Sequence, residues 1–378
     1  MTAPYDPRAP GLLRFHDARA RFRAGDDTPV KYLERCLARI AAREPAVKAF
    51  TSANLDAAMV AAEAAVKRYR DGAPLSPIDG LPIAVKDIFE TRDAPTGWGS
   101  AHLQATPGSR DAAIVHALRQ GGAALVGKTA LPELGFGPPA ATTNPWDAER
   151  TPGGSSSGSA ASVGAAMVPV AIGTQGKGSL TRPASLCGVY GFKPGHGTIH
   201  RGGDGGSQAT NTHVGTLAGS LEDAWITARY LSETAGPHPG GIGLTGPAEP
   251  PAPVAPKTLV RLEAAGWPET ESPARGAYEA LLAAIAGAGV EVAHAAEDPA
   301  WAALEAELDA AAGALAKIAD YESRWPLVMY LMRDRDEGLG AFAPLTHERG
   351  MKRLAVTRAE YEEALGYRRD FRARIAAL

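Results

Sequence analysis

The sequence predicts an α/β fold with a largely buried β-sheet, and two observations lead to this prediction. Segments with apolar residues at helical spacing alternate with short apolar runs that are typical of buried strands. Such alternation is the pattern of helices packed on the faces of a sheet. The 378-residue chain is also 45% hydrophobic, which is ample for a buried core.

The predicted elements follow from apolar spacing along the chain. In residues 30–43, Leu33, Cys36, Leu37 and Ile40 share one side of a helix. Helices are predicted at 30–43, 55–69, 111–120, 160–166, 221–231, 277–288, 301–321 and 359–378. Strands are predicted at the short apolar runs 83–85, 123–126, 168–172, 258–262 and 290–292.

One segment, 236–256, interrupts this pattern. It is rich in Pro and Gly and lacks periodicity, so it is predicted to be a long surface excursion or linker. The alanine-rich helices at 301–321 and 359–378 leave two interpretations open. They pack into the core, which is the commoner case, or they form the face of a homodimer.

Two glycine loops that carry serines are the most informative feature of the chain. Ser155 lies in GGSSSGS at 153–159, and Ser179 lies in GTQGKGS at 173–179. A small, apolar stretch separates the loops. Hydroxyls on tight backbone are what acyl transfer needs, because glycine lets the main chain approach a substrate and aim its N–H groups at a developing oxyanion.

With these loops the chain resembles the amidase signature hydrolases. That family's signature reads roughly GGSSGGSAA, then GTxxxGS, xRPA, CG and GxKP. The matching residues here lie at 153–159, 173–179, 182–184, 187–188 and 191–194, with further likeness in GLPIAVKD at 80–87 and VGTLAGSLEDA at 214–224. The resemblance is strong over 29–231 and weak elsewhere. It implies a mixed central sheet flanked by helices, in a single amidase domain over 1–378.

The resemblance also implies a catalytic triad and its surroundings. Ser179 would be the nucleophile, Ser155 the bridging serine and Lys86 the base. The backbone N–H groups of Gly176, Lys177, Gly178 and Ser179 would form the oxyanion hole, and Gly153, Gly154 and Lys177 would contact substrate.

The chemistry of such a triad is sound for these residue types. A serine hydroxyl needs a neighbouring base, and a lysine acts as one only when its amine is neutral. Lys86 follows the apolar run LPIAV, which predicts a buried strand, and burial lowers a lysine pKa. Ser155 can donate and accept a hydrogen bond, so it can relay the proton.

The chain departs from the family pattern in the second loop. Gly176 and Lys177 stand where the family has a threonine and a small residue. The long side chain of Lys177 would clasp an acidic group of the substrate, point to solvent, or obstruct the site. The loop also differs from the DTGGSIRxPA type of amidotransferase subunits, because residues 175–184 read QGKGSLTRPA.

The second departure is length. The chain stops at Leu378, after a helix that leads into a further strand in family members. The C-terminal part is therefore expected to be shortened, which would leave the active site open. Together the two departures keep an alternative in view, a weak or inactive relative that serves as a binding or assembly subunit. An amidotransferase subunit is a further alternative, although its usual loop differs.

Two other site types compete for the same region. A phosphate-binding P-loop needs a lysine directly before Ser or Thr, but Gly178 separates Lys177 from Ser179. A histidine triad would use His196, His200 or His213, although histidines in glycine-rich loops are more often surface residues than bases.

Composition narrows the remaining function classes. The formal net charge is −3 without a basic tract, which does not indicate a nucleic-acid partner. Cys36 and Cys187 lack metal-ligand spacing, so neither a metal nor a disulfide framework is predicted.

The segment Met1–Asp27 lacks the apolar core of a signal peptide, and the most apolar stretch, 160–172, is too short to span a membrane. The sequence therefore predicts a cytoplasmic amidase that acts on a small-molecule amide without a cofactor.

Overall fold

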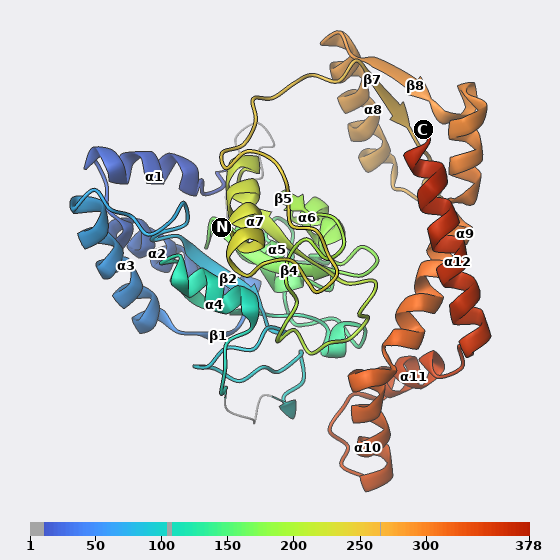
Figure 1. Cartoon of the computed structure of the whole chain (residues 1–378), viewed down its shortest axis with the longest axis horizontal. Helices are drawn as coiled ribbons and strands as arrows, with labels where there is room; N and C mark the ends of the chain where they lie inside the picture. The colour runs from blue at the N-terminus through green and yellow to red at the C-terminus, as the bar shows by residue number, and fades with distance from the viewer. Residues whose placement is uncertain (1–10, 104–107, 265) are drawn as a thin grey trace. The chain divides into compact units, whose positions relative to one another are not determined.

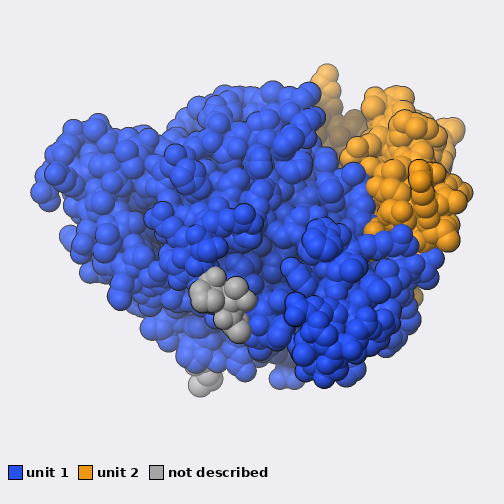
Figure 2. Space-filling model, turned by 60° about the horizontal axis from the view of Figure 1, so that its bottom comes forward, with its two compact units in different colours: residues 1–250, 322–355 blue, residues 251–321, 356–378 orange. Residues whose placement is uncertain are grey.

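The computed structural model describes residues 11–103, 108–264 and 266–378. The chain divides into two compact units, shown in different colours in Figure 2. Unit 1 comprises Met1–Pro250 and Glu322–Ala355, and unit 2 comprises Pro251–Tyr321 and Val356–Leu378. The single domain predicted over 1–378 stays a prediction. The first ten residues of Met1–Asp27, the segment predicted to lack a signal peptide, lie outside the described residues.

A six-stranded mixed sheet forms the centre of unit 1 (Figure 1). Its order is β1-β3-β2-β4-β6-β5. The strands are β1 (Phe50–Ala53), β2 (Pro82–Lys86), β3 (Ala124–Thr129), β4 (Val170–Gln175), β5 (Tyr190–Phe192) and β6 (His213–Ala218). Strand β2 runs parallel to both β3 and β4, whereas the β1–β3, β4–β6 and β5–β6 pairs are antiparallel. The predicted mixed α/β sheet is confirmed.

The parallel pairing of β2 with β4 positions the site. Val85 of β2 is in register with Ile172 of β4. Because the C-terminal ends of parallel strands meet at one edge of a sheet, Lys86 and Thr174 emerge side by side there. Every residue of β2, β3 and β4 is buried, which explains why these strands read as continuous apolar runs rather than as alternating patterns.

Nine helices among the described residues belong to unit 1. They are α1 (Phe15–Ala24), α2 (Pro29–Val47), α3 (Leu55–Arg70), α4 (Ala113–Gln120), α5 (Ser157–Gly164), α6 (Thr181–Cys187), α7 (Leu221–Thr234), α10 (Met329–Glu337) and α11 (Pro344–Arg353). Figure 1 shows α1, α2 and α3 grouped at one side of this unit. The helices predicted at 30–43, 55–69, 111–120 and 221–231 are confirmed within a few residues.

Helix α5 packs directly behind the first serine loop. All eight of its residues are buried, and they are small. A Cβ added at Gly158 would lie 2.1 Å from the Ala49 carbonyl oxygen and 2.5 Å from the Ala130 nitrogen, so only glycine permits this approach. The helix begins at Ser157, three residues before the predicted start at 160, because the serines themselves form its first turn.

Unit 2 is mainly helical. It contains β7 (Thr258–Arg261) and β8 (Glu291–His294), a parallel pair, with α8 (Ser272–Gly287), α12 (Arg358–Ala376) and most of α9 (Pro299–Glu322). Helix α12 begins with a capping box between Thr357 and Glu360. The rings of Tyr321 and Tyr361 stack with centroids 4.3 Å apart, which joins α9 to α12. All five elements predicted after residue 256 are confirmed within a few residues, and 236–256 contains neither helix nor strand.

Among the described residues, none of the helices has the combination of length and apolar character that crossing a membrane requires.

Candidate active site

Lys86 ends β2 inside the protein. Its Nζ hydrogen-bonds to Ser155 Oγ at 2.7 Å and to Thr174 Oγ1 at 3.0 Å. The residue is 2% exposed. The lysine predicted as the base and the serine predicted as the bridge therefore lie in direct contact, although 69 residues separate them in the chain.

Burial changes the acidity of this lysine. Desolvation lowers the pKa of Lys86 from its usual 10.5 to about 7, and the negative charge of Asp204 opposes the shift in part. A lysine with this pKa has a substantial neutral fraction near neutral pH, so its amine can accept a proton.

The first serine loop is held in place around Ser155. The Gly154–Ser155 peptide bond is cis. Gly153 has a φ of +77°, and a Cβ there would lie 3.0 Å from Pro183 Cα, so glycine suits this position. The Gly154 carbonyl oxygen accepts a hydrogen bond of 2.6 Å from Arg182 Nη2, and Ser157 Oγ donates to the Gly153 carbonyl oxygen at 2.7 Å.

The second serine loop joins β4 to α6, and backbone bonds tie it to the first. Ser156 N–H donates to the Ser179 carbonyl oxygen at 3.0 Å. Gln175 Oε1 accepts from the backbone N–H groups of Leu180 at 2.9 Å and Thr181 at 2.8 Å. The side chain of Gln175 thus satisfies two donors at the start of α6, just beyond the serine.

Both predicted catalytic serines line one cavity of about 680 Å³. Gly153 and Gly154 line it as well. No hydrogen bond joins the hydroxyls of Ser155 and Ser179 among the residues that the structure describes. The cavity has the size of a typical small-molecule site.

The rest of the predicted second loop does not line this cavity. Gly176, Lys177 and Gly178 are not among the residues that line this cavity, and Lys177 is exposed. The oxyanion hole assigned to residues 176–179 and the substrate contact assigned to Lys177 stay predictions.

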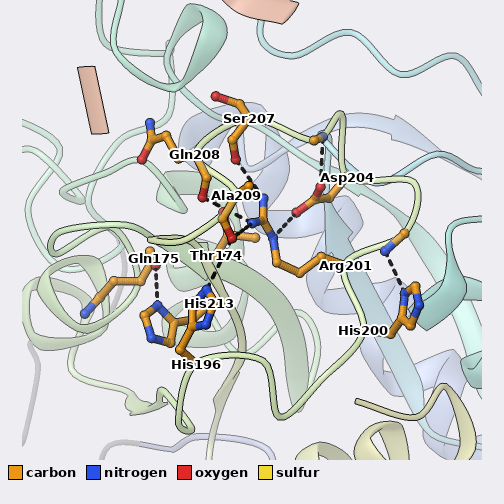
Figure 3. Close-up of polar contacts among 12 residues, drawn as sticks. Thr174, Gln175, His196, His200, Arg201, Asp204, Ser207, Gln208, Ala209 and His213 are labelled. Carbon is orange, nitrogen blue, oxygen red and sulfur yellow. Dashed lines mark hydrogen bonds and ion pairs between the residues drawn. The ribbon is translucent and has the colours of Figure 1, made fainter. Parts of the chain in front are cut away.

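The predicted histidines make polar contacts beside the second serine loop, drawn in Figure 3. His213 Nδ1 lies 3.1 Å from the Gln175 carbonyl oxygen, and His196 Nε2 lies 3.3 Å from that of Ala209. His200 Nδ1 accepts from Gly202 N–H at 2.9 Å. Burial, helped by the charge of Lys193, lowers the pKa of His213 to about 4.

A buried ion pair lies in the same region. Arg201 Nε lies 2.7 Å from Asp204 Oδ2, and both residues are buried (Figure 3). The Arg201 guanidinium also donates to the carbonyl oxygens of Ser207, Gln208 and Ala209. These hydrogen bonds hold Arg201 in place, and the ion pair with Arg201 positions Asp204. The negative charge of Asp204 raises the pKa of Lys86.

Sequence reasoning missed several residues of the site. Thr174, a partner of Lys86, directly follows Gly173 in the matched GT pair, so the motif held a signal for it. Asp204 and Arg349 lie in stretches without a motif, and only the folded chain brings them near the site.

Potential metal ligands do not gather in the described part of the chain. Within residues 11–103, 108–264 and 266–378, no cluster of three or more His, Cys, Asp or Glu side chains is arranged to hold a metal ion. Cys36 and Cys187 are both buried, unpaired thiols.

Solved structures share this fold along nearly the whole chain. A crystal structure of an amidase matches with a TM-score of 0.80 and 25% identity, over 96% of this chain and 79% of that one. A chain from a vestigial protein complex, described in connection with the evolutionary origins of an s-triazine catabolic enzyme, matches with a TM-score of 0.79 and 28% identity. That match covers 97% of this chain and 79% of the other.

Sequence relatives match a little over half of the chain. The A subunit of the glutamyl-tRNA(Gln) amidotransferase from Chloroflexus aurantiacus is 41% identical over 221 residues, and its namesake from Anaeromyxobacter sp. (strain K) is 41% identical over 206 residues. These matches cover 57% and 53% of this chain, but only 45% and 42% of the relatives. The chain thus spans less than half the length of the curated relatives it matches. The model of the amidase family matches residues 31–377, and the chain belongs to that family.

Proposed function

We propose that this protein is an amidase that hydrolyses a carboxylic amide or a related acyl C–N bond through a serine acyl-enzyme. Ser179 is the nucleophile, Ser155 the bridge and Lys86 the base. One observation carries the proposal: a buried lysine with a pKa of about 7 contacts Ser155 at 2.7 Å, and Ser155 and Ser179 line the same cavity.

The proposed reaction begins with proton transfer. Neutral Lys86 accepts the proton of Ser155 while Ser155 accepts that of Ser179, and Ser179 Oγ attacks the amide carbon. Thr174 accepts a hydrogen bond from Lys86 Nζ, which leaves the amine lone pair free to face Ser155. Backbone N–H groups of residues 176–179 are the proposed donors to the oxyanion, and of these four residues Ser179 lines the cavity.

The second half of the reaction returns the protons. As the C–N bond breaks, the proton held by Lys86 passes through Ser155 to the leaving nitrogen, and ammonia or an amine departs. Water then attacks the acyl-enzyme, giving its proton to the same relay, and releases the carboxylic acid with Ser179 restored. Atoms and charge balance without a cofactor in this scheme.

A second candidate is an amidotransferase subunit, and the names of the sequence relatives favour it. Such a protein would deliver the released ammonia to a partner instead of to solvent. Against it, the loop at 175–184 reads QGKGSLTRPA instead of the DTGGSIRxPA type. Ammonia release by the isolated protein separates the candidates, because a protein that depends on partners would release little. A cytoplasmic location and a homodimer also stay predictions.

A fluorophosphonate probe with mass spectrometry tests the nucleophile. We expect covalent labelling on the peptide that contains Ser179, lost in Ser179→Ala. Ser185→Ala is the matched control, because Ser185 is an exposed serine of α6 that does not line the cavity. Absence of labelling in the wild type would favour an inactive relative that serves in binding or assembly, and labelling of a different serine would contradict the triad.

A further inference from the structure

The space beside Gly176 in the second serine loop is occupied by a side chain from a distant segment. Gly176 stands where the family pattern has a threonine. Gly176 has no positive φ, so its own backbone would accept a side chain. A Cβ added there would lie 2.7 Å from Gln208 Oε1, which is too close for atoms that are not bonded. The side chain of Gln208, and not the backbone, therefore excludes a larger residue at position 176.

The backbone of Gln208 is held in an uncommon conformation. Its φ is +53°, in the left-handed region that glycine adopts more readily than other residues. Three donors converge on its carbonyl oxygen: the N–H groups of Asn211 at 3.1 Å and Thr212 at 3.0 Å, and Arg201 Nη1 at 3.2 Å (Figure 3). These hydrogen bonds stabilise the conformation in which the Gln208 side chain lies against the second serine loop.

The far end of the same side chain is anchored as well. Gln208 Nε2 donates to the Oγ atom of Ser323 at 3.3 Å, and Ser323 is buried. Ser323 Oγ also accepts a hydrogen bond of 2.8 Å from Arg353 Nη1. The Arg353 guanidinium lies 4.1 Å from the ring centroid of Phe136, which lines the cavity of the two serines. Contacts thus run from the second serine loop through Gln208 to the cavity wall.

A second amide faces the same space beside Gly176. Asn211 is 3% exposed, and its Nδ2 has no hydrogen-bond partner among the residues that the structure describes. This nitrogen would lie 3.6 Å from a Cβ at position 176. A hydroxyl on a side chain at that position could accept a hydrogen bond from it. The surroundings would therefore suit a threonine at position 176 if the Gln208 side chain were removed.

We propose that Gln208 is a positioning residue for the second serine loop, an inference that rests on the proposed amidase activity. Its amide occupies the space of the side chain that Gly176 lacks and restrains the loop, so that Ser179 keeps its place in the cavity. Gln208 does not line the cavity, so it acts through the loop rather than on the substrate. The restraint matters because a displacement of about 1 Å at a reacting group can reduce a rate on the order of 10²-fold.

The test exchanges the two side chains. The rate at which a fluorophosphonate probe labels Ser179 is measured in the wild type, in Gln208→Ala, in Gly176→Thr and in the double variant. Gln208→Ala removes the restraint and should lower the maximal labelling rate on the order of 10-fold. The probe concentration that gives half of the maximal rate should change little, because Gln208 does not contact the probe.

The double variant distinguishes a contact from two independent effects. Gly176→Thr alone places its side chain against Gln208 Oε1 and should also lower the labelling rate. In the double variant the threonine occupies the vacated space, so the rate should recover to within about threefold of the wild type. Losses that multiply in a folded double variant would overturn the proposal.

Two further variants keep the test decisive. Gln208→Gly accepts a φ of +53° without strain, so it should show the same loss even if Gln208→Ala folds poorly. Gln120→Ala is the matched control, because Gln120 is an exposed glutamine of α4 that does not line the cavity, and it should match the wild type. An unchanged labelling rate in a folded Gln208→Gly protein would contradict the inference.

Labelling of the wild type tests the proposed function by itself. If Ser179 is labelled but the losses multiply in the double variant, the proposed function stands and this inference fails. If the wild type is neither labelled nor releases ammonia, the proposed function fails, and urea unfolding of the same four proteins decides the inference. Losses of stability that are smaller in the double variant than their sum would support the contact between Gln208 and the loop, and additive losses would reject it.

Discussion

Lys86 Nζ and Ser155 Oγ lie 2.7 Å apart in the interior, at the edge of the sheet where β2 ends. The contact joins a strand to the loop before α5, and a second bond of 3.0 Å links the same Nζ to Thr174 at the end of β4. Three segments distant in sequence therefore converge on one amine. This convergence underlies the first three predictions that follow.

Removal of the proposed nucleophile should abolish turnover without disturbing the fold. Ser179→Ala deletes the attacking atom and leaves almost no cavity, so its melting temperature should stay close to that of the wild type. Ser155→Ala and Lys86→Ala should each lower kcat on the order of 10²-fold or more, because they break proton transfer. Ammonia release and thermal melting check these outcomes. Wild-type activity in Ser179→Ala would refute the assignment.

The rate should depend on pH through Lys86. Only the neutral amine accepts a proton, so kcat/KM should be low at acidic pH and rise as pH increases through about 7, the pKa of Lys86. Because Asp204 opposes the lowering of that pKa, Asp204→Asn should move the rise to lower pH.

A histidine base would behave differently in the same experiment. His196→Ala and His213→Ala should keep the rise of kcat/KM with increasing pH, because neither residue belongs to the Lys86 contacts. If this rise disappears in either variant, the lysine mechanism is wrong.

The same lysine should make folding stability depend on pH. In the unfolded chain its pKa is near 10.4, against about 7 in the folded protein. Between these values the unfolded state binds a proton that the folded state lacks, so the wild type loses stability as pH falls toward 7, by at most about 1.4 kcal/mol per pH unit. Lys86→Met removes this pH-dependent contribution to the free energy of unfolding. Its free energy of unfolding relative to the wild type should therefore rise as pH falls from about 10 to about 7.

Urea unfolding at several pH values measures that difference. Lys177→Met is the matched control, since it removes an exposed lysine from the same region. A constant difference between Lys86→Met and the wild type across this range would show that Lys86 is not buried as a neutral amine.

Local patterns sufficed to predict the elements that bury the site. The run LPIAV before Lys86 predicts a buried strand, and β2 is buried throughout. Strand β6 was not predicted, because His213–Ala218 mixes polar and small residues and follows a glycine-rich loop. Helix α1 was missed as well, since its arginines mask the buried Phe15 and Phe22.

Long-range contacts explain what sequence reasoning could not find. Arg349 reaches the cavity because residues 322–355 return to unit 1 after about 70 residues of unit 2. Glu133 fixes that return, accepting hydrogen bonds from Ala343 N–H at 3.0 Å and from the Thr346 hydroxyl. No pattern of residue spacing along the chain predicts that residues 322–355 return to unit 1. The two serine loops, by contrast, flank a single helix and strand, so their convergence followed from local order.

The last prediction concerns Lys177, which the sequence adds to the family pattern. Three roles are open to its side chain. It recognises an acidic substrate, it obstructs the active site, or it points to solvent. Because that side chain is exposed and lies outside the cavity lining, we expect Lys177→Gly to weaken turnover of the acidic amide glutaramate by less than about fivefold, since exposed charge contacts contribute at most about 1 kcal/mol. Turnover of a neutral amide of similar shape, 5-oxohexanamide, should not change. A gain on this neutral amide would instead show that Lys177 obstructs the active site, and a loss on glutaramate well beyond fivefold would show that Lys177 recognises acidic substrates.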